Sequence, residues 1–141
     1  MEPTNKKVSL LRIVAATIYD SLLLLGVWFL VGSLDLGVRY VFTGEISPLG
    51  PIAGISLVIL STWLYFAMFW IYGGKTLGMS SWKLRIISQN GNQITIIQTI
   101  VRFLSNIFTV LFAGIPFFFR QINKNDKSLS DLLSKTSIIS D

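Results

Sequence analysis

Residues 51–72 read PIAGISLVILSTWLYFAMFWIY and contain no charged side chain. An α-helix rises 1.5 Å per residue, so this segment is about 33 Å long as a helix and can cross the roughly 30 Å hydrocarbon core of a bilayer. Pro51 suits the first helical turn, where its missing N–H costs nothing, and Gly73-Gly74 suits the end of the helix. We therefore predict a membrane-spanning helix over residues 51–72.

A second apolar run covers residues 13–34, between Arg12 and Asp35, and carries a single charge at Asp20. Its length also predicts a membrane span. The basic residues before it resemble the start of a secretion signal, but the run is too long and lacks a convincing cleavage site, so we expect a retained anchor.

The composition of the whole chain agrees with a membrane protein. Of 141 residues, 52% are hydrophobic and 13% are charged, against about 25% charged in soluble domains. The chain has no Cys and no His, so thiol nucleophiles, histidine acid-base catalysis and Cys or His metal sites are excluded. We expect no enzymatic activity and no cofactor. The net charge of +5 is spread over termini and loops, so we expect no nucleic-acid binding.

The region after the second span alternates between apolar and polar residues at Trp82, Leu84 and Ile86 and then reaches Asn90-Gly91. Asn-Gly favours a type I′ turn, so the pattern predicts a short cytoplasmic β-hairpin. Thr95 and Gln98 match a capping box and predict a helix that begins near Ile96.

The third helical region, residues 96–119, is amphipathic and contains Arg102. Two alternatives stay open. The region lies in the interface or re-enters the membrane around Gly114 to Pro116, or else it spans the membrane. The first alternative agrees better with the basic tail, residues 120–141, because cytoplasmic segments retain Lys and Arg. Lys6, Lys7 and Arg12 indicate a cytoplasmic N-terminus, so we expect both termini to lie in the cytoplasm of a cell-membrane protein.

Asp20 is a costly residue, because a carboxylate near the centre of a span is unfavourable by roughly 2.5 to 3.5 kcal/mol on insertion scales. Ala16 and Asp20 share a helical face, so we expect this face to contact other helices. The carboxylate either fixes helix packing or carries a proton or cation. Arg12 and Arg102 are the candidate charge partners of Asp20.

Several segments together resemble the RDD family of small multi-pass membrane proteins, which is named for one arginine and two aspartates. The matching residues are Arg12, Asp20, Gly74-Lys75-Thr76-Leu77-Gly78, Lys83-Leu84-Arg85-Ile86-Ile87, Arg102 and the segment from Ser128 to Thr136. The resemblance identifies Asp131 as the second family aspartate, although Ser130 stands where the family often has histidine. It implies a helical membrane domain for which ligand transport is a common suggestion.

Taken together, the sequence predicts one all-α integral membrane domain over residues 1–141, a helical bundle with two transmembrane helices. Two functions stay open. One is transport of an ion or small solute that uses Asp20, with Arg12, Arg102 and Asp131 in the same charge network. The other is an accessory or assembly protein in which these charges only fix packing. Because so few helices cannot enclose a pathway, we expect a homo-oligomer or a second membrane protein. With both termini inside, we also expect Arg12 to pair with Asp131.

Overall fold

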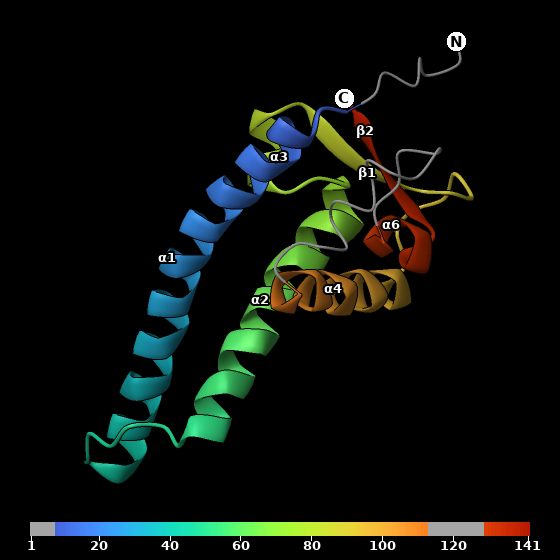
Figure 1. The fold of residues 1–141 in the computed structure, drawn as a ribbon. Helices are drawn as coiled ribbons and strands as arrows, with labels where there is room; N and C mark the ends of the chain where they lie inside the picture. The colour runs from blue at the N-terminus through green and yellow to red at the C-terminus, as the bar shows by residue number, and fades with distance from the viewer. Residues whose placement is uncertain (1–7, 113–128) are drawn as a thin grey trace.

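The computed structural model describes residues 8–112 and 129–141, which are mostly helical. Figure 1 shows two long helices joined by a loop at one end, with the shorter elements gathered at the other end. The elements are, in order, α1 (Leu10–Thr43), α2 (Pro51–Gly73), α3 (Leu77–Ser81), β1 (Leu84–Ser88), α4 (Ile96–Leu111), α6 (Leu129–Ser134) and β2 (Thr136–Ser140).

The two long helices are apolar and long enough to cross a membrane, as the sequence predicts. α2 has nearly the predicted bounds and is capped by Gly74, which adopts the left-handed conformation and donates its N–H to the Trp70 carbonyl at 3.1 Å. α1 is longer than the predicted 13–34 and reaches Thr43, or about 51 Å at 1.5 Å per residue. Its additional turns hold Asp35 and Arg39, which form an ion pair at 2.9 Å one turn apart.

Most large apolar side chains of α1 and α2 are exposed. A soluble protein would bury such surfaces, whereas a bilayer covers them. Within the membrane-length part of the pair, the Trp28 indole N–H donates to the Thr62 hydroxyl at 2.8 Å and joins the helices. The exposed apolar surface is therefore that expected of a helical hairpin in lipid.

The remaining small elements, α3, β1, α6 and β2, form a compact unit that we call the cap. Figure 1 shows it at the end of the hairpin where α1 begins and α2 ends. Its interior is mixed: Leu84 and Ile86 of β1 are almost completely buried together with Trp70 of α2, and so are the polar side chains of Asp131 and Thr136. The cap therefore rests on the ends of both long helices.

The predicted β-hairpin is wrong. Leu84–Ser88 does form a strand with alternating burial, but it pairs antiparallel with β2, with Ile86 opposite Ile138. Gly91 does make a turn, with φ of 72° and its N–H donating to the Ser88 carbonyl at 3.0 Å. The capping box at Thr95 follows so closely that no residues remain for a returning strand, and the end of the chain supplies the partner instead.

α4 begins where the sequence predicts, and both capping-box hydrogen bonds between Thr95 and Gln98 are present. Its 16 residues extend about 24 Å, which is too short to cross a bilayer core. The polar residues Thr99, Arg102 and Ser105 are buried, whereas its apolar residues are largely exposed. In Figure 1 this helix lies across α2. The expected turn around Gly114 to Pro116 lies outside the described residues.

Candidate functional site

Asp20 is the central residue of the candidate site, since it is only 4% exposed and lies where α1 meets α2 and the cap. Its carboxylate accepts three hydrogen bonds. The Gly78 N–H donates to Oδ1 at 2.9 Å, the Tyr65 hydroxyl donates to Oδ1 at 3.2 Å, and the Thr76 hydroxyl donates to Oδ2. All three donors are neutral, and no cationic side chain of the described segments pairs with Asp20. The expected pairing of Asp20 with Arg12 or Arg102 is therefore wrong.

The turn after α2 is shaped to reach this carboxylate. Thr76 is the N-cap of α3, so its hydroxyl oxygen accepts from the Met79 N–H while its proton points to Asp20. At Gly78 a side chain is excluded, because a Cβ would lie 2.8 Å from the Asp20 carboxyl carbon and would collide with the Ala16 carbonyl. Ala16 is 2% exposed, so the shared face of Ala16 and Asp20 contacts α3 as well as α2.

Arg12 has a different role from the one expected. Its guanidinium donates to the backbone carbonyls of Trp82 and Lys83, the latter at 3.2 Å, and to the Ser140 hydroxyl at 3.4 Å. It therefore joins the first turn of α1 to the residues just before β1 and to the end of β2. The expected pairing of Arg12 with Asp131 is wrong, because Asp131 lies on α6, which packs against α4.

Asp131 pairs with Arg102 instead. Arg102 Nη1 donates to Asp131 Oδ1 at 2.6 Å and to the Thr136 hydroxyl at 2.8 Å. Both charged side chains are buried, and the guanidinium carbon lies 5.6 Å from the centre of the Trp70 ring. This buried pair fastens α4 to α6 and β2, and the cation–π contact joins it to α2.

The four residues predicted from sequence therefore do not form one charge network. Asp20 occupies one place, Arg12 a second, and Arg102 with Asp131 a third. Sequence reasoning missed Tyr65, Thr76 and Gly78 as the partners of Asp20. The signal for two of them was present in Gly74-Lys75-Thr76-Leu77-Gly78, a segment in which glycines and a capping threonine follow directly after a span.

A model of the RDD family matches residues 9–135 of the chain. The chain belongs to the RDD family. This family is membrane-associated, in agreement with the two long apolar helices. No curated protein and no solved structure matched the chain.

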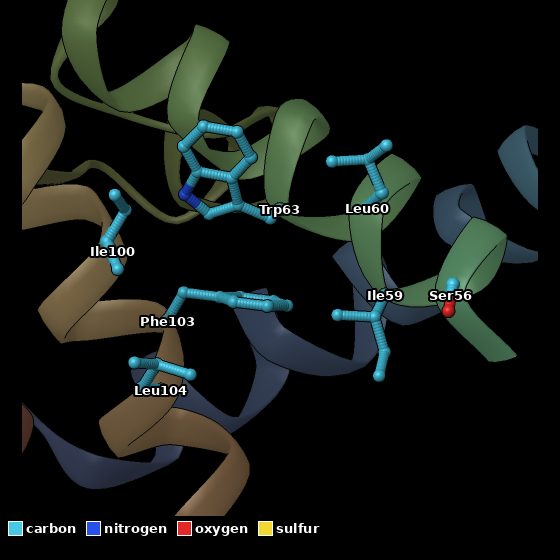
Figure 2. Close-up of a pocket in the computed structure, with 7 residues that line it drawn as sticks. All are labelled: Ser56, Ile59, Leu60, Trp63, Ile100, Phe103 and Leu104. Atoms are coloured by element: carbon cyan, nitrogen blue, oxygen red, sulfur yellow. The ribbon is translucent and has the colours of Figure 1, made fainter.

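The RDD domain also has an apolar groove of about 370 Å³ between α2 and α4. Figure 2 shows Trp63 and Phe103 facing each other across it, with Ser56 at one end. The indole N–H of Trp63 is buried and has no hydrogen-bond partner among the described residues. The groove contains no charged lining residue, and no group of acidic side chains in the described segments is suited to hold a metal ion.

At the surface of the RDD domain, the hydrogen bond from Lys75 Nζ, at 2.5 Å, lowers the pKa of Asp141 below its usual 3.8, and Arg85 at 3.4 Å adds to this effect. A lowered folded-state pKa adds stability above pH 3.8 that is lost as the pH falls through the folded value. The side chains are about one-third exposed, so the contribution is at most about 1 kcal/mol.

Asp141→Asn should therefore unfold at a slightly lower temperature than the parent chain at pH 7 and at the same temperature near pH 2. Thermal unfolding in detergent at both pH values measures this difference. High salt at pH 7 should reduce it, because exposed charges are screened. If the difference in unfolding temperature persists at pH 2, the ion pair between Lys75 and Asp141 is not its cause.

Proposed function

We propose that this RDD domain is an integral protein of the cell membrane that binds a proton or a small cation at Asp20 and exchanges it during transport. The observation that supports the proposal is the burial of an acidic side chain whose partners among the described residues are all neutral. Proteins normally pair a buried charge with an opposite one, because an unpaired ion in a low-dielectric environment is costly.

The hydrogen bonds of Asp20 leave it able to bind a further group. A carboxylate has about four lone-pair positions, and the described donors occupy two on Oδ1 and one on Oδ2. A proton or small cation at Oδ2 would neutralise the charge and remove most of the cost of burying it. Oxygen ligands such as carboxylate and hydroxyl suit hard cations.

Transport needs more than one copy of this chain or a second membrane protein. Two spans and a helix as short as α4 cannot enclose a pathway, and intramembrane charges must line a cavity together. The exposed apolar faces of α1 and α2 are available for such contacts. We therefore propose that the transporting form is a homo-oligomer or a complex with another membrane protein.

The test is ion flux in proteoliposomes that contain only this chain. We expect flux driven by a proton or sodium gradient, and we expect Asp20→Asn to reduce it at least about tenfold, since the amide keeps the size but cannot exchange a proton. The matched control is Asp35→Asn, which removes a carboxylate of the same helix that already pairs with Arg39. Absence of flux in the parent chain under every gradient would overturn transport by the chain alone.

A second candidate function is an accessory or assembly role. It is favoured by the contacts of Arg12, Arg102 and Asp131, each of which joins elements within the chain. In that case the charges fix packing, a partner carries the activity, and Asp35→Asn and Asp20→Asn should differ only in stability. Like transport, this role requires no enzymatic activity.

We further propose that both ends of the described chain face the cytoplasm. The contact between Arg12 and Ser140 brings the start of α1 and the end of β2 to the same end of the hairpin, and basic residues concentrate there.

Because the chain has no cysteine, Glu45→Cys and Asn92→Cys can be labelled separately in intact cells with an impermeant maleimide. We expect labelling of the first only. Labelling of Asn92→Cys only would show that both ends of the described chain face away from the cytoplasm.

A further inference from the structure

The two strands of the cap repeat one another in sequence. Residues 83–88 read KLRIIS and residues 135–140 read KTSIIS, so Lys, two Ile and Ser recur at the same positions. The strand register centres on Ile86 opposite Ile138, which are equivalent residues of the two copies. An antiparallel pair of equivalent strands with this register has a local two-fold axis through its centre.

The backbone obeys the same two-fold relation outside the paired residues. Lys83 and Lys135, just before the two strands, have φ of 53° and 52° and are the non-glycine residues with positive φ in the described segments. The Asp141 N–H donates to the Lys83 carbonyl at 2.8 Å, and the Gln89 N–H donates to the Lys135 carbonyl at 3.0 Å. Each feature of one half therefore has its counterpart in the other.

The relation extends to α1 and α4. Their starts read VSLLR at 8–12 and ITIIQ at 94–98, with Arg12 and Gln98 both at the third position of their helices. Arg12 donates to the Lys83 carbonyl and the Ser140 hydroxyl. Gln98 donates to the Lys135 carbonyl at 3.4 Å and the Ser88 hydroxyl at 3.1 Å. These are equivalent acceptors in opposite halves.

Continuing along both helices places Asp20 opposite Asn106. Asp20 Oδ1 accepts from the Gly78 N–H at 2.9 Å, and Asn106 Oδ1 accepts from the Ser130 hydroxyl at 2.7 Å. Gly78 and Ser130 occupy the same position in the two short helices that precede the strands. The same contact is thus made twice. Between α1 and α3 the acceptor is a carboxylate, and between α4 and α6 it is an amide.

We infer that the chain contains two copies of one unit, in which a helix packs on a short helix followed by a left-handed lysine and a strand, and that the charge of Asp20 is not needed for this packing. The second copy makes the equivalent contact with an uncharged acceptor. This inference deepens the proposed function and rests on it in one respect: the role given to the Asp20 charge, which is to bind the proton or cation, comes from the proposed function. At this contact the first copy has a charged acceptor, Asp20, and the second copy has an uncharged one, Asn106.

The copies differ where the proposed function needs them to differ. In the first copy the Asp20 carboxylate also accepts hydrogen bonds from two hydroxyl groups, those of Tyr65 on α2 and of Thr76. In the second copy the neighbour one turn before Asn106 is Arg102, whose charge is already paired with Asp131. A mobile cation is therefore favoured beside Asp20 and disfavoured beside Asn106.

The test compares four variants of the full chain in detergent by thermal unfolding, at several pH values and with sodium or potassium chloride. Asp20→Leu and Asn106→Leu should both lower the unfolding temperature by several degrees, because each leaves a donor of the short helix without its acceptor. Asp20→Asn should stay within about 2 °C of the parent chain. Its amide keeps the acceptor for Gly78 and directs an N–H to the Thr76 oxygen. Asn106→Ser provides a milder change at the second contact in case leucine prevents folding.

Apart from the pH dependence that the Asp141 ion pair produces, the unfolding temperature of the parent chain should change with pH or with added cation, and Asp20→Asn should lose that part of the dependence. If Asp20→Asn destabilises the chain as much as Asp20→Leu does, the charge is part of the packing and the inference is overturned. If both Asn106 variants leave stability unchanged, the equivalence of the two copies is overturned. Absence of flux in proteoliposomes, with Asp20→Asn stable and insensitive to ions, would overturn transport while leaving cation binding at Asp20 supported.

Discussion

Replacing Arg102 by glutamine is expected to lower the free energy of unfolding by about 3–5 kcal/mol, because it removes the guanidinium from a buried ion pair with Asp131. Asp131 is 1% exposed and Arg102 is 4% exposed, so water cannot replace the lost partner. The substitution also removes the hydrogen bond to Thr136 and the cation–π contact with Trp70. Chemical or thermal unfolding in detergent measures the loss.

The control for this prediction is Arg39→Gln. Arg39 pairs with Asp35 across one helical turn, but both side chains are more than one-quarter exposed, so the expected loss is about 0.5 kcal/mol or less. The double variant Arg102→Met with Asp131→Leu should lose less than Arg102→Gln alone, since it removes both buried charges. Equal losses for Arg102→Gln and Arg39→Gln would contradict a desolvated pair.

The second large effect is expected for Gly78→Ala, which should destabilise the chain by about 1–3 kcal/mol. The added Cβ would collide with the Ala16 carbonyl and lie 2.8 Å from the Asp20 carboxyl carbon. The first of these is backbone inside α1, so the whole of α3 has to move. We expect the Asp20 hydrogen bonds to weaken and any Asp20-dependent flux to fall as well.

Gly54→Ala is the matched glycine substitution. Gly54 lies inside α2, and a Cβ there would meet no atom within 4 Å. Alanine is the better helix former, so this variant should be as stable as the parent chain or more stable by up to about 1 kcal/mol. If Gly78→Ala behaves like Gly54→Ala, the close approach of α3 to α1 is not essential to the fold.

The features that the sequence predicts correctly depend on residues near one another in the chain. Both long helices follow from uninterrupted apolar runs, and the start of α4 follows from the capping box at Thr95 and Gln98. In each case the local pattern and the tertiary contacts favour the same structure.

The features that the sequence predicts wrongly depend on distant pairings. Asn90-Gly91 is a strong turn signal, but nothing in the local pattern shows that the partner of β1 is β2. Opposite charge similarly suggested Arg12 as the partner of Asp131, whereas the packing of α6 on α4 brings Arg102 there. The partners of Asp20 are neutral, so a search for a countercharge could not find them.

The pairing of β1 with β2 also determines an order of assembly. When residues 84–88 leave the ribosome, the strand that will pair with them has not yet been made, and at 5–20 residues per second synthesis takes roughly 3–10 s to reach it. During that interval the backbone donors and acceptors of β1 are bound only to water or to another protein, whereas α1 and α2 already satisfy theirs internally. The newly made hairpin can therefore enter the membrane before the carbonyl groups that hold Arg12 are fixed in place. A stalled or truncated chain that lacks β2 would therefore expose the unpaired edge of β1 next to an inserted hairpin, where proteases and chaperones can bind it.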